Sequence, residues 1–157
     1  MEHEEYMRQA LELARLAMAE GEVPVGCVIV RDGAVVGRGR NRRETAQTAL
    51  GHAELEAIAQ ACRTLGGWRL AGCALYVTLE PCPMCAGGII SARIPEIYYG
   101  AKDAGFGACG SILNLFEEDF RHHPKIVGHI LEDECAQVLR DFFARMREKC
   151  PENLKIL

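Results

Sequence analysis

The chain has 157 residues, of which 25% are charged and 49% hydrophobic, and its formal net charge is −4. This length and composition are typical of a globular protein with one hydrophobic core, and we expect a single domain over residues 1–157. No apolar run approaches the ~18 residues of a membrane span, and the acidic start at residues 1–5 is unlike a signal peptide. We therefore expect a cytoplasmic protein with no membrane partner.

Hydrophobic periodicity and turn residues divide the chain into alternating elements. An Asp-Gly pair at 32–33 favours a tight hairpin turn, Pro83 suits the first turn of a helix, and Pro151 is expected to stop the last helix. The order predicts an α/β fold, with a single mixed β-sheet sandwiched by helices on both faces. The predicted elements are a helix over 4–20, strands over 27–30 and 34–36, a helix over 53–64, a strand over 75–79, a helix over 83–92, a strand over 97–99, a helical turn near 112–116, a strand over 126–127 and a helix over 133–149.

Two short motifs carry the chemistry of this chain: His-Ala-Glu at 52–54 and Pro-Cys-Pro-Met-Cys at 81–85. His52, Cys82 and Cys85 are side chains that zinc prefers as ligands. A structural zinc is closed by four protein ligands, whereas a catalytic zinc takes three and keeps a position for water. No fourth Cys or His stands at a short spacing from either motif. The count predicts one open, catalytic zinc per chain.

The predicted helices place these residues together. His52 and Glu54 fall at the start of one helix and the two cysteines at the start of another, where residues three apart share a face. Helix N-termini favour the thiolate form that a zinc ligand needs. Glu54 is expected to remain outside the ligand set, take a proton from the attacking water and return it to the substrate.

Other interpretations of the same residues remain open. A buried core histidine and a Cys-x-x-Cys that packs or does thioredoxin-like redox chemistry would account for each half, but not for Glu54. The chain has eight cysteines, of which Cys27, Cys62 and Cys73 stand in apolar segments, where a free cysteine behaves as a small hydrophobe. A cytosolic protein of this size needs no disulfide framework.

Basic residues gather in two segments of this acidic chain. Five arginines against one acid stand between Arg31 and Arg43, and the last predicted helix carries Arg140, Arg145, Arg147 and Lys149. Mixed, solvated surfaces explain each segment taken singly. The two together favour, weakly, an anionic partner such as a nucleic acid.

The paired motifs match the H-x-E and P-C-x-x-C signature of zinc-dependent nucleobase deaminases, and the chain from about Tyr6 to the last helix resembles the bacterial tRNA-specific adenosine deaminases of the cytidine deaminase superfamily. Further segments carry the resemblance: Glu22–Gly26, Asn41–Arg42, Leu75–Cys82, Cys85–Gly87, Tyr99–Asp103, Gly110–Ser111, Asp133–Ala136 and Asp141–Phe143. The resemblance implies a cytidine deaminase-like fold and a homodimer that converts adenosine to inosine at the wobble position of a tRNA anticodon. It also implies zinc on His52, Cys82 and Cys85, with Glu54 as the proton shuttle.

The resemblance further implies that Asn41 hydrogen-bonds a flipped nucleotide and that Val25 and Ala53 line its pocket. The adjacent phenylalanines at 142–143 point about 100° apart on a helix. The resemblance favours one in the core and the other, assigned to Phe143, against an anticodon base, whereas the sequence alone leaves core packing of both open. Contacts to the phosphates of the anticodon stem are expected chiefly from Arg145, Arg147 and Lys149, and from Arg42 or Arg43 near the pocket.

Two other functions remain open. A guanine, cytosine or free-nucleoside deaminase would share the same zinc site. A non-catalytic, zinc-stabilised RNA-binding subunit would have no use for Glu54. The segment at 121–124, Arg-His-His-Pro, departs from the family pattern, and we expect its histidines to be solvated.

Overall fold

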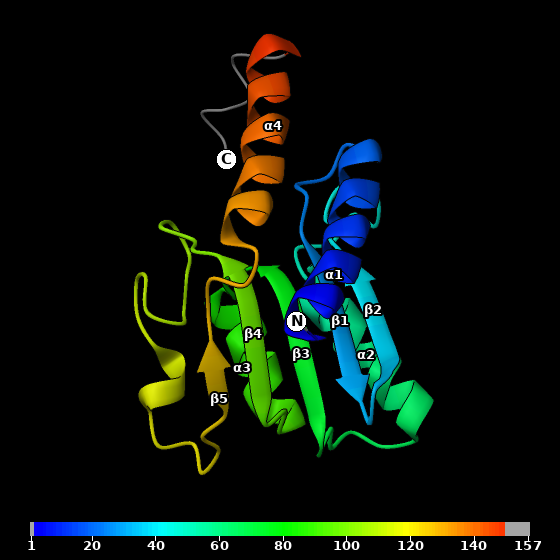
Figure 1. Ribbon diagram of the computed structural model, residues 1–157, viewed down its shortest axis with the longest axis vertical. Helices are drawn as coiled ribbons and strands as arrows, with labels where there is room; N and C mark the ends of the chain where they lie inside the picture. The colour runs from blue at the N-terminus through cyan, green and yellow to red at the C-terminus, as the bar shows by residue number, and fades with distance from the viewer. Residues whose placement is uncertain (1, 150–157) are drawn as a thin grey trace.

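The computed structural model describes residues 2–149. Within this range, α-helices and β-strands alternate along the chain (Figure 1). In chain order the elements are α1 (Glu2–Ala19), β1 (Gly26–Arg31), β2 (Ala34–Arg40), α2 (Ala53–Leu65), β3 (Cys73–Leu79), α3 (Pro83–Ala92), β4 (Glu96–Ala101), the 3₁₀ helix η1 (Leu115–Glu117), β5 (Lys125–Val127) and α4 (Glu132–Lys149).

The strands form one mixed sheet in the order β2-β1-β3-β4-β5. β1 is antiparallel to both β2 and β3, whereas β3, β4 and β5 are parallel to one another. β2, β3 and β4 therefore run in the same direction, and their last residues, Arg40, Leu79 and Ala101, lie at one edge of the sheet, which we call the carboxyl edge. Ligands of open α/β sheets bind outside an edge of this kind.

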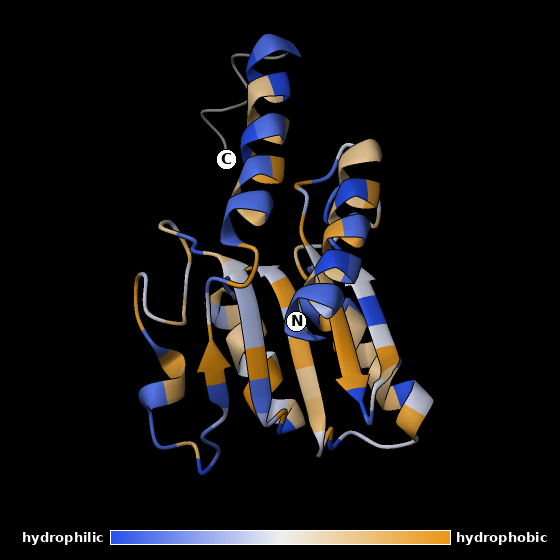
Figure 2. Ribbon diagram, in the orientation of Figure 1, coloured by the Kyte–Doolittle hydropathy of each residue, from blue (hydrophilic) through white to orange (hydrophobic). Residues whose placement is uncertain are grey.

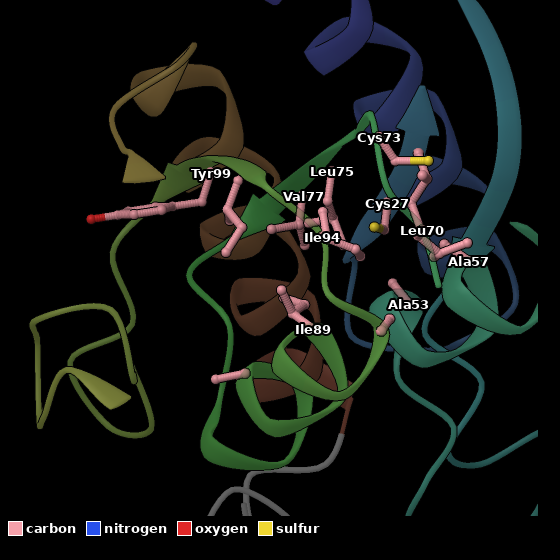
Figure 3. Close-up of a cluster of buried hydrophobic side chains, with 14 of the residues drawn as sticks. Cys27, Ala53, Ala57, Leu70, Cys73, Leu75, Val77, Ile89, Ile94 and Tyr99 are labelled. Atoms are coloured by element: carbon pink, nitrogen blue, oxygen red, sulfur yellow. The ribbon is translucent and has the colours of Figure 1, made fainter. Parts of the chain in front are cut away.

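Helices cover both faces of the sheet: α1 and α4 lie on one face, and α2 and α3 on the other (Figure 1). Successive side chains of a strand point to opposite faces, so Cys27 and Ile29 of β1 pack towards α2 and α3, whereas Val28 packs towards α1. Figure 2 shows β1 as a continuous apolar strand, as expected where both faces are buried. Figure 3 shows the cluster on the side of α2 and α3, with Ala57 and Ile89 among its members.

Glycines in β1 and β2 allow helices to approach the sheet closely. A Cβ atom on Gly26 of β1 would collide with the carbonyl oxygen of Ala10 in α1, and one on Gly39 of β2 would collide with that of Ala53 in α2. Glycine in a strand often marks such an approach of another backbone. The contact between Gly39 and Ala53 holds the first turn of α2 against the end of β2, beside His52.

The fold predicted from the sequence, one mixed sheet with helices on both faces, is confirmed. The hairpin turn is also confirmed, since Asp32 and Gly33 have φ values of 51° and 77°, both positive as a type I′ turn requires. β2 continues to Arg40, beyond its predicted end, although glycine weakens strand formation. The close packing of β2 against α2 stabilises the strand at its glycines.

Other boundaries differ slightly from the predictions. The predicted helical turn near 112–116 is the 3₁₀ helix η1, which begins three residues later because the Asn114 side chain accepts the N–H of Phe116 and caps it. The predicted stop at Pro151 and the last part of the expected domain, residues 150–157, lie outside the described residues. Within residues 2–149, no helix is both long and apolar enough to cross a membrane.

Candidate metal centre and active site

Three side chains that can hold a metal meet at the carboxyl edge. His52 is the N-cap residue of α2 and Cys82 that of α3, both with extended backbone, and Cys85 follows in the first turn of α3. The Nδ1 atom of His52 lies 3.7 Å from Sγ of Cys82 and 3.5 Å from Sγ of Cys85. All three ligand atoms lie within 4.8 Å of one another. The structure thus brings together the three residues that the sequence predicted as ligands.

The spacing of these atoms fits a tetrahedral zinc ion. Zn–S bonds of about 2.3 Å and Zn–N bonds of about 2.05 Å, at the tetrahedral angle, separate nitrogen and sulfur by about 3.6 Å. Both N–S distances of this site agree with that value to within about 0.1 Å. Among residues 2–149, no other cluster of His, Cys, Asp and Glu side chains meets the geometry of a metal site.

The protonation of the two thiols also indicates a cation. A hydrogen bond from Cys85, together with the neighbouring His52, lowers the pKa of Cys82 to about 4. The same hydrogen bond and burial raise the pKa of Cys85 far above its usual value. The protein alone therefore stabilises one thiolate and disfavours the second. A positive ion between the sulfurs would stabilise both, which is the donor set that zinc takes.

Glu54 lies beside this cluster and is almost inaccessible to solvent, at 4% exposed. It stands in the first turn of α2, two residues after His52, and faces the same cavity. Burial raises the pKa of its carboxyl to about 7. A group with a pKa near neutrality can both accept a proton and return it, which is the property required of a general acid and base.

The cluster opens into a cavity of about 750 Å³, a volume suited to a ligand of nucleoside size. Two loops flank it, one after β2 and one after β4. The residues that line it are Val23, Val25, Asn41, Arg43, His52, Ala53, Glu54, Leu79, Glu80, Cys82, Pro83, Met84, Lys102, Asp103, Ala104, Gly105, Phe106, Leu139 and Phe143.

Four predicted substrate-binding residues, Val25, Asn41, Ala53 and Phe143, line this cavity. The Asn41 amide is held in place, since its Nδ2 donates to the carbonyl of Val23 at 3.2 Å and its Oδ1 accepts the N–H of Arg43 at 3.4 Å. One N–H of the amide remains for a ligand.

The two adjacent phenylalanines of α4 take different positions. Phe142 is buried at 5% exposed, whereas Phe143 is half-buried at the cavity and meets Phe142 edge to face, with ring centroids 5.3 Å apart. Arg145 and Arg147 are exposed on the part of α4 that projects beyond the sheet (Figure 1), and neither lines the cavity. Any contact they make with a substrate must therefore lie outside the pocket.

The segment Lys102–Phe106, for which no role was predicted, forms one wall of the cavity. A signal was present, because this segment directly follows a predicted strand and ligands gather beyond strand ends. The histidines at 122–123 were expected to be solvated. The prediction fails for His122, whose Nε2 lies 2.7 Å from the carbonyl oxygen of Ile94 and joins its loop to the start of β4.

Comparisons with known proteins agree on a deaminase. The model of the MafB19-like deaminase family matches residues 1–147. The chain is 45% identical over 145 residues to the tRNA-specific adenosine deaminase of Bacillus subtilis, covering 92% of this chain and 90% of that protein.

Two solved structures are also similar. One comes from a study of A-to-I editing by tRNA:A34 deaminases at the wobble position of transfer RNA. It is 44% identical, with a TM-score of 0.83, over 86% of this chain and 99% of that one. The other is the guanine deaminase of Bacillus subtilis, 40% identical with a TM-score of 0.63, over 68% of this chain and 72% of that one. The tRNA-specific adenosine deaminase of Bacillus subtilis and the structure from the tRNA:A34 deaminase study each match most of the chain. The chain therefore belongs to the tRNA-specific adenosine deaminases.

Proposed function

We propose that this protein hydrolytically deaminates adenosine to inosine at the wobble position of a tRNA anticodon. The observation that carries the proposal is the meeting of a buried carboxylate, Glu54, with a His-Cys-Cys cluster at the base of one open cavity. The relatives named for tRNA deamination, which match nine-tenths of the chain, support the substrate.

His52, Cys82 and Cys85 are proposed to hold one zinc ion per chain. The N–S distances and the two-thiolate donor set support this choice of metal. Bound there, zinc supplies Lewis acidity that makes a water molecule acidic near neutral pH. The placement of His52 and Cys82 as N-cap residues of two helices fixes their directions before any metal binds.

Glu54 performs the proton transfers. Its carboxylate accepts a proton from the attacking water as the water oxygen bonds to C6 of adenine, and it passes that proton to the ring nitrogen. The second proton of the water travels the same way to the leaving amino group, so that C–N cleavage releases ammonia and leaves inosine. Burial keeps bulk water from the carboxylate and holds its pKa at about 7, near working pH.

The pocket is proposed to take a nucleotide that has left its stack. A base within a helix cannot reach a recessed site, whereas an anticodon loop presents unstacked bases at low cost. Asn41 is proposed to hydrogen-bond the nucleotide, with Val25 and Ala53 beside it, Phe143 stacking on a neighbouring base, and Arg145 and Arg147 contacting phosphates. We further propose that the protein is a homodimer located in the cytoplasm. Light scattering of the purified protein tests its dimeric state.

Deamination of a free guanine base is the second candidate. The 40% identity to the guanine deaminase of Bacillus subtilis favours it. That match covers about two thirds of the chain and superimposes less well than the tRNA deaminase does. A non-catalytic RNA-binding subunit is disfavoured, because it gives no reason to bury the Glu54 carboxylate beside the proposed metal ligands.

An ammonia-release assay with tRNA, adenosine, cytidine and guanine distinguishes these candidates. The proposal predicts turnover of tRNA far above that of the three small substrates. Preferred turnover of guanine would establish the second candidate instead. No ammonia from any substrate, with the protein folded and loaded with zinc, would support the non-catalytic alternative.

A further inference from the structure

Two buried carboxylates outside the proposed chemistry hold the loops that flank the cavity, and one of them, Glu80, also lines it. Glu22 is 1% exposed and Glu80 is 2% exposed. Within residues 2–149, neither forms a salt bridge. A buried carboxylate without a counter-charge is unfavourable unless hydrogen bonds stabilise it. The donors around each carboxylate therefore indicate its role.

Glu80 is surrounded by donors from the loop that follows β4. Its Oε1 accepts the N–H of Asp103 at 3.2 Å and the hydroxyl of Ser111, while its Oε2 accepts the N–H groups of Cys109 at 2.9 Å and Ser111 at 3.2 Å. These hydrogen bonds gather residues 102–111, which we call the β4 loop, around one side chain. Gly107 lies so close that a Cβ atom there would collide with Oε2 of Glu80.

The same loop forms a wall of the cavity through its segment 102–106. Glu80 stands two residues before Cys82, and the carbonyl of the intervening Pro81 accepts the N–H of Ala108 at 2.8 Å. One short stretch of chain thus supplies a metal ligand and anchors the wall that faces it. The distance between the metal centre and this wall is fixed by local hydrogen bonds.

Glu22 has the corresponding position behind the loop that follows β2. Its Oε1 accepts the N–H of Glu44 at 3.1 Å and its Oε2 that of Thr45 at 2.7 Å. Residues 41–51, which we call the β2 loop, bring Asn41 and Arg43 to the cavity. The two loops therefore share one arrangement, with backbone N–H groups directed at a buried carboxylate.

We propose that Glu22 and Glu80 are positioning residues, each of which holds one loop of the cavity in its substrate-binding conformation before the substrate arrives. Their partners support this role over general stabilisation of the core, since every donor to the two carboxylates belongs to a loop. If a loop moved away, its backbone N–H groups and the carboxylate would lose these hydrogen bonds, which opposes the movement. The identity of the substrate comes from the proposed function, on which this role rests; the hydrogen bonds do not depend on it.

Amide hydrogen exchange of the zinc-loaded protein tests the two anchors separately. Glu80→Gln keeps the size of the side chain but replaces one acceptor oxygen by an NH₂ group, which cannot accept from the backbone. Its expected effect is exchange at least about tenfold faster at one or more of the Asp103, Cys109 and Ser111 amides that donate to Glu80, with Glu44 and Thr45 unchanged. Glu22→Gln should instead speed exchange at the amides of Glu44 and Thr45, with the amides around Glu80 unchanged. Unchanged exchange in both loops of both variants would overturn the proposal.

Kinetics with tRNA add a readout that a purely structural role would not move. Each Gln variant should raise KM several-fold, with a smaller change in kcat and an unchanged zinc content. The matched control is Ile94→Val, a buried residue that precedes the start of β4 and so lies away from the carboxyl edge. It should lower Tm without altering KM or exchange in either loop. An equal rise in KM in this control would contradict the positioning role.

If Glu80→Gln fails to fold, Ser111→Ala tests the same anchor, because it removes only the hydrogen bond from the Ser111 hydroxyl and leaves the carboxylate in place. Faster exchange at the Ser111 amide supports the anchor, and unchanged exchange contradicts it. Failure of the proposed function would show differently. The wild-type protein would then turn over no tRNA while the exchange pattern still reported on the loops.

Discussion

The ring nitrogen Nδ1 of His52 lies 3.5 Å from the sulfur of Cys85, although 33 residues separate them along the chain. This contact depends on two helices that start at the same edge of the sheet, and it predicts a metal centre that one substitution destroys. Wild-type protein should contain about one zinc per chain, and Cys85→Ser should contain almost none. Cys27→Ser is the control, since Cys27 is equally buried but lies in β1 outside the cluster. Elemental analysis that finds zinc in Cys85→Ser would contradict the proposed ligand set.

Removal of the Glu54 carboxylate should separate metal binding from catalysis. Glu54→Gln keeps the volume of this buried side chain but cannot carry a proton, so we expect kcat to fall by roughly 10²–10⁴-fold with zinc content unchanged. The control is Glu56→Gln, on the same helix, where Glu56 is partly exposed and pairs with Arg42. Its kcat should remain close to that of the wild type. Full activity of Glu54→Gln would assign the proton transfers to another group.

Alanine substitutions at the adjacent phenylalanines should have opposite effects. Phe142→Ala removes a buried ring and should lower the free energy of unfolding by roughly 3 kcal/mol. Phe143→Ala should change stability by less than about 1 kcal/mol but raise KM for tRNA roughly tenfold, the value of one lost base stack. Denaturant unfolding and steady-state kinetics measure the two effects. A similar loss of stability in both variants, with KM unchanged, would place both rings in the core only.

Charge reversal on the projecting part of α4 tests the predicted phosphate contacts. The double variant Arg145→Glu with Arg147→Glu should raise KM for tRNA and flatten its dependence on salt, because fewer counterions are released on binding. Turnover of a minimal substrate should change little. The control reverses Arg63 and Arg69, two exposed arginines around the end of α2 that do not line the cavity. An equal rise in KM from both double variants would show that the effect comes from net charge and not from phosphate contacts of α4.

The cluster of His52, Cys82 and Cys85 could be predicted from the sequence because each helix start is a local signal. Pro83 begins α3 where its fixed φ is favourable, and this determines where Cys82 and Cys85 point. The full length of β2 could not be predicted in this way. Gly37 and Gly39 contribute little to a strand by themselves, and only the approach of α2, a tertiary contact, explains them.

The roles of Glu22 and Glu80 could not be predicted, although both residues stand in segments that carry the family resemblance. An acidic residue between apolar neighbours at the end of a strand or helix is a signal of a buried, hydrogen-bonded carboxylate. Their donors, however, come from loops 22 to 31 residues further along the chain. No spacing rule connects such positions, so the partners emerge only from the folded chain.

The most direct test of the central claim is nucleoside analysis of an anticodon stem-loop RNA that carries adenosine at the wobble position and elsewhere in the loop, after incubation with the zinc-loaded protein. We expect inosine at the wobble position alone, one ammonia for each inosine, and no product with Glu54→Gln. Inosine spread over all loop adenosines would contradict the assigned specificity. Unaltered RNA together with rapid release of ammonia from guanine would contradict the substrate.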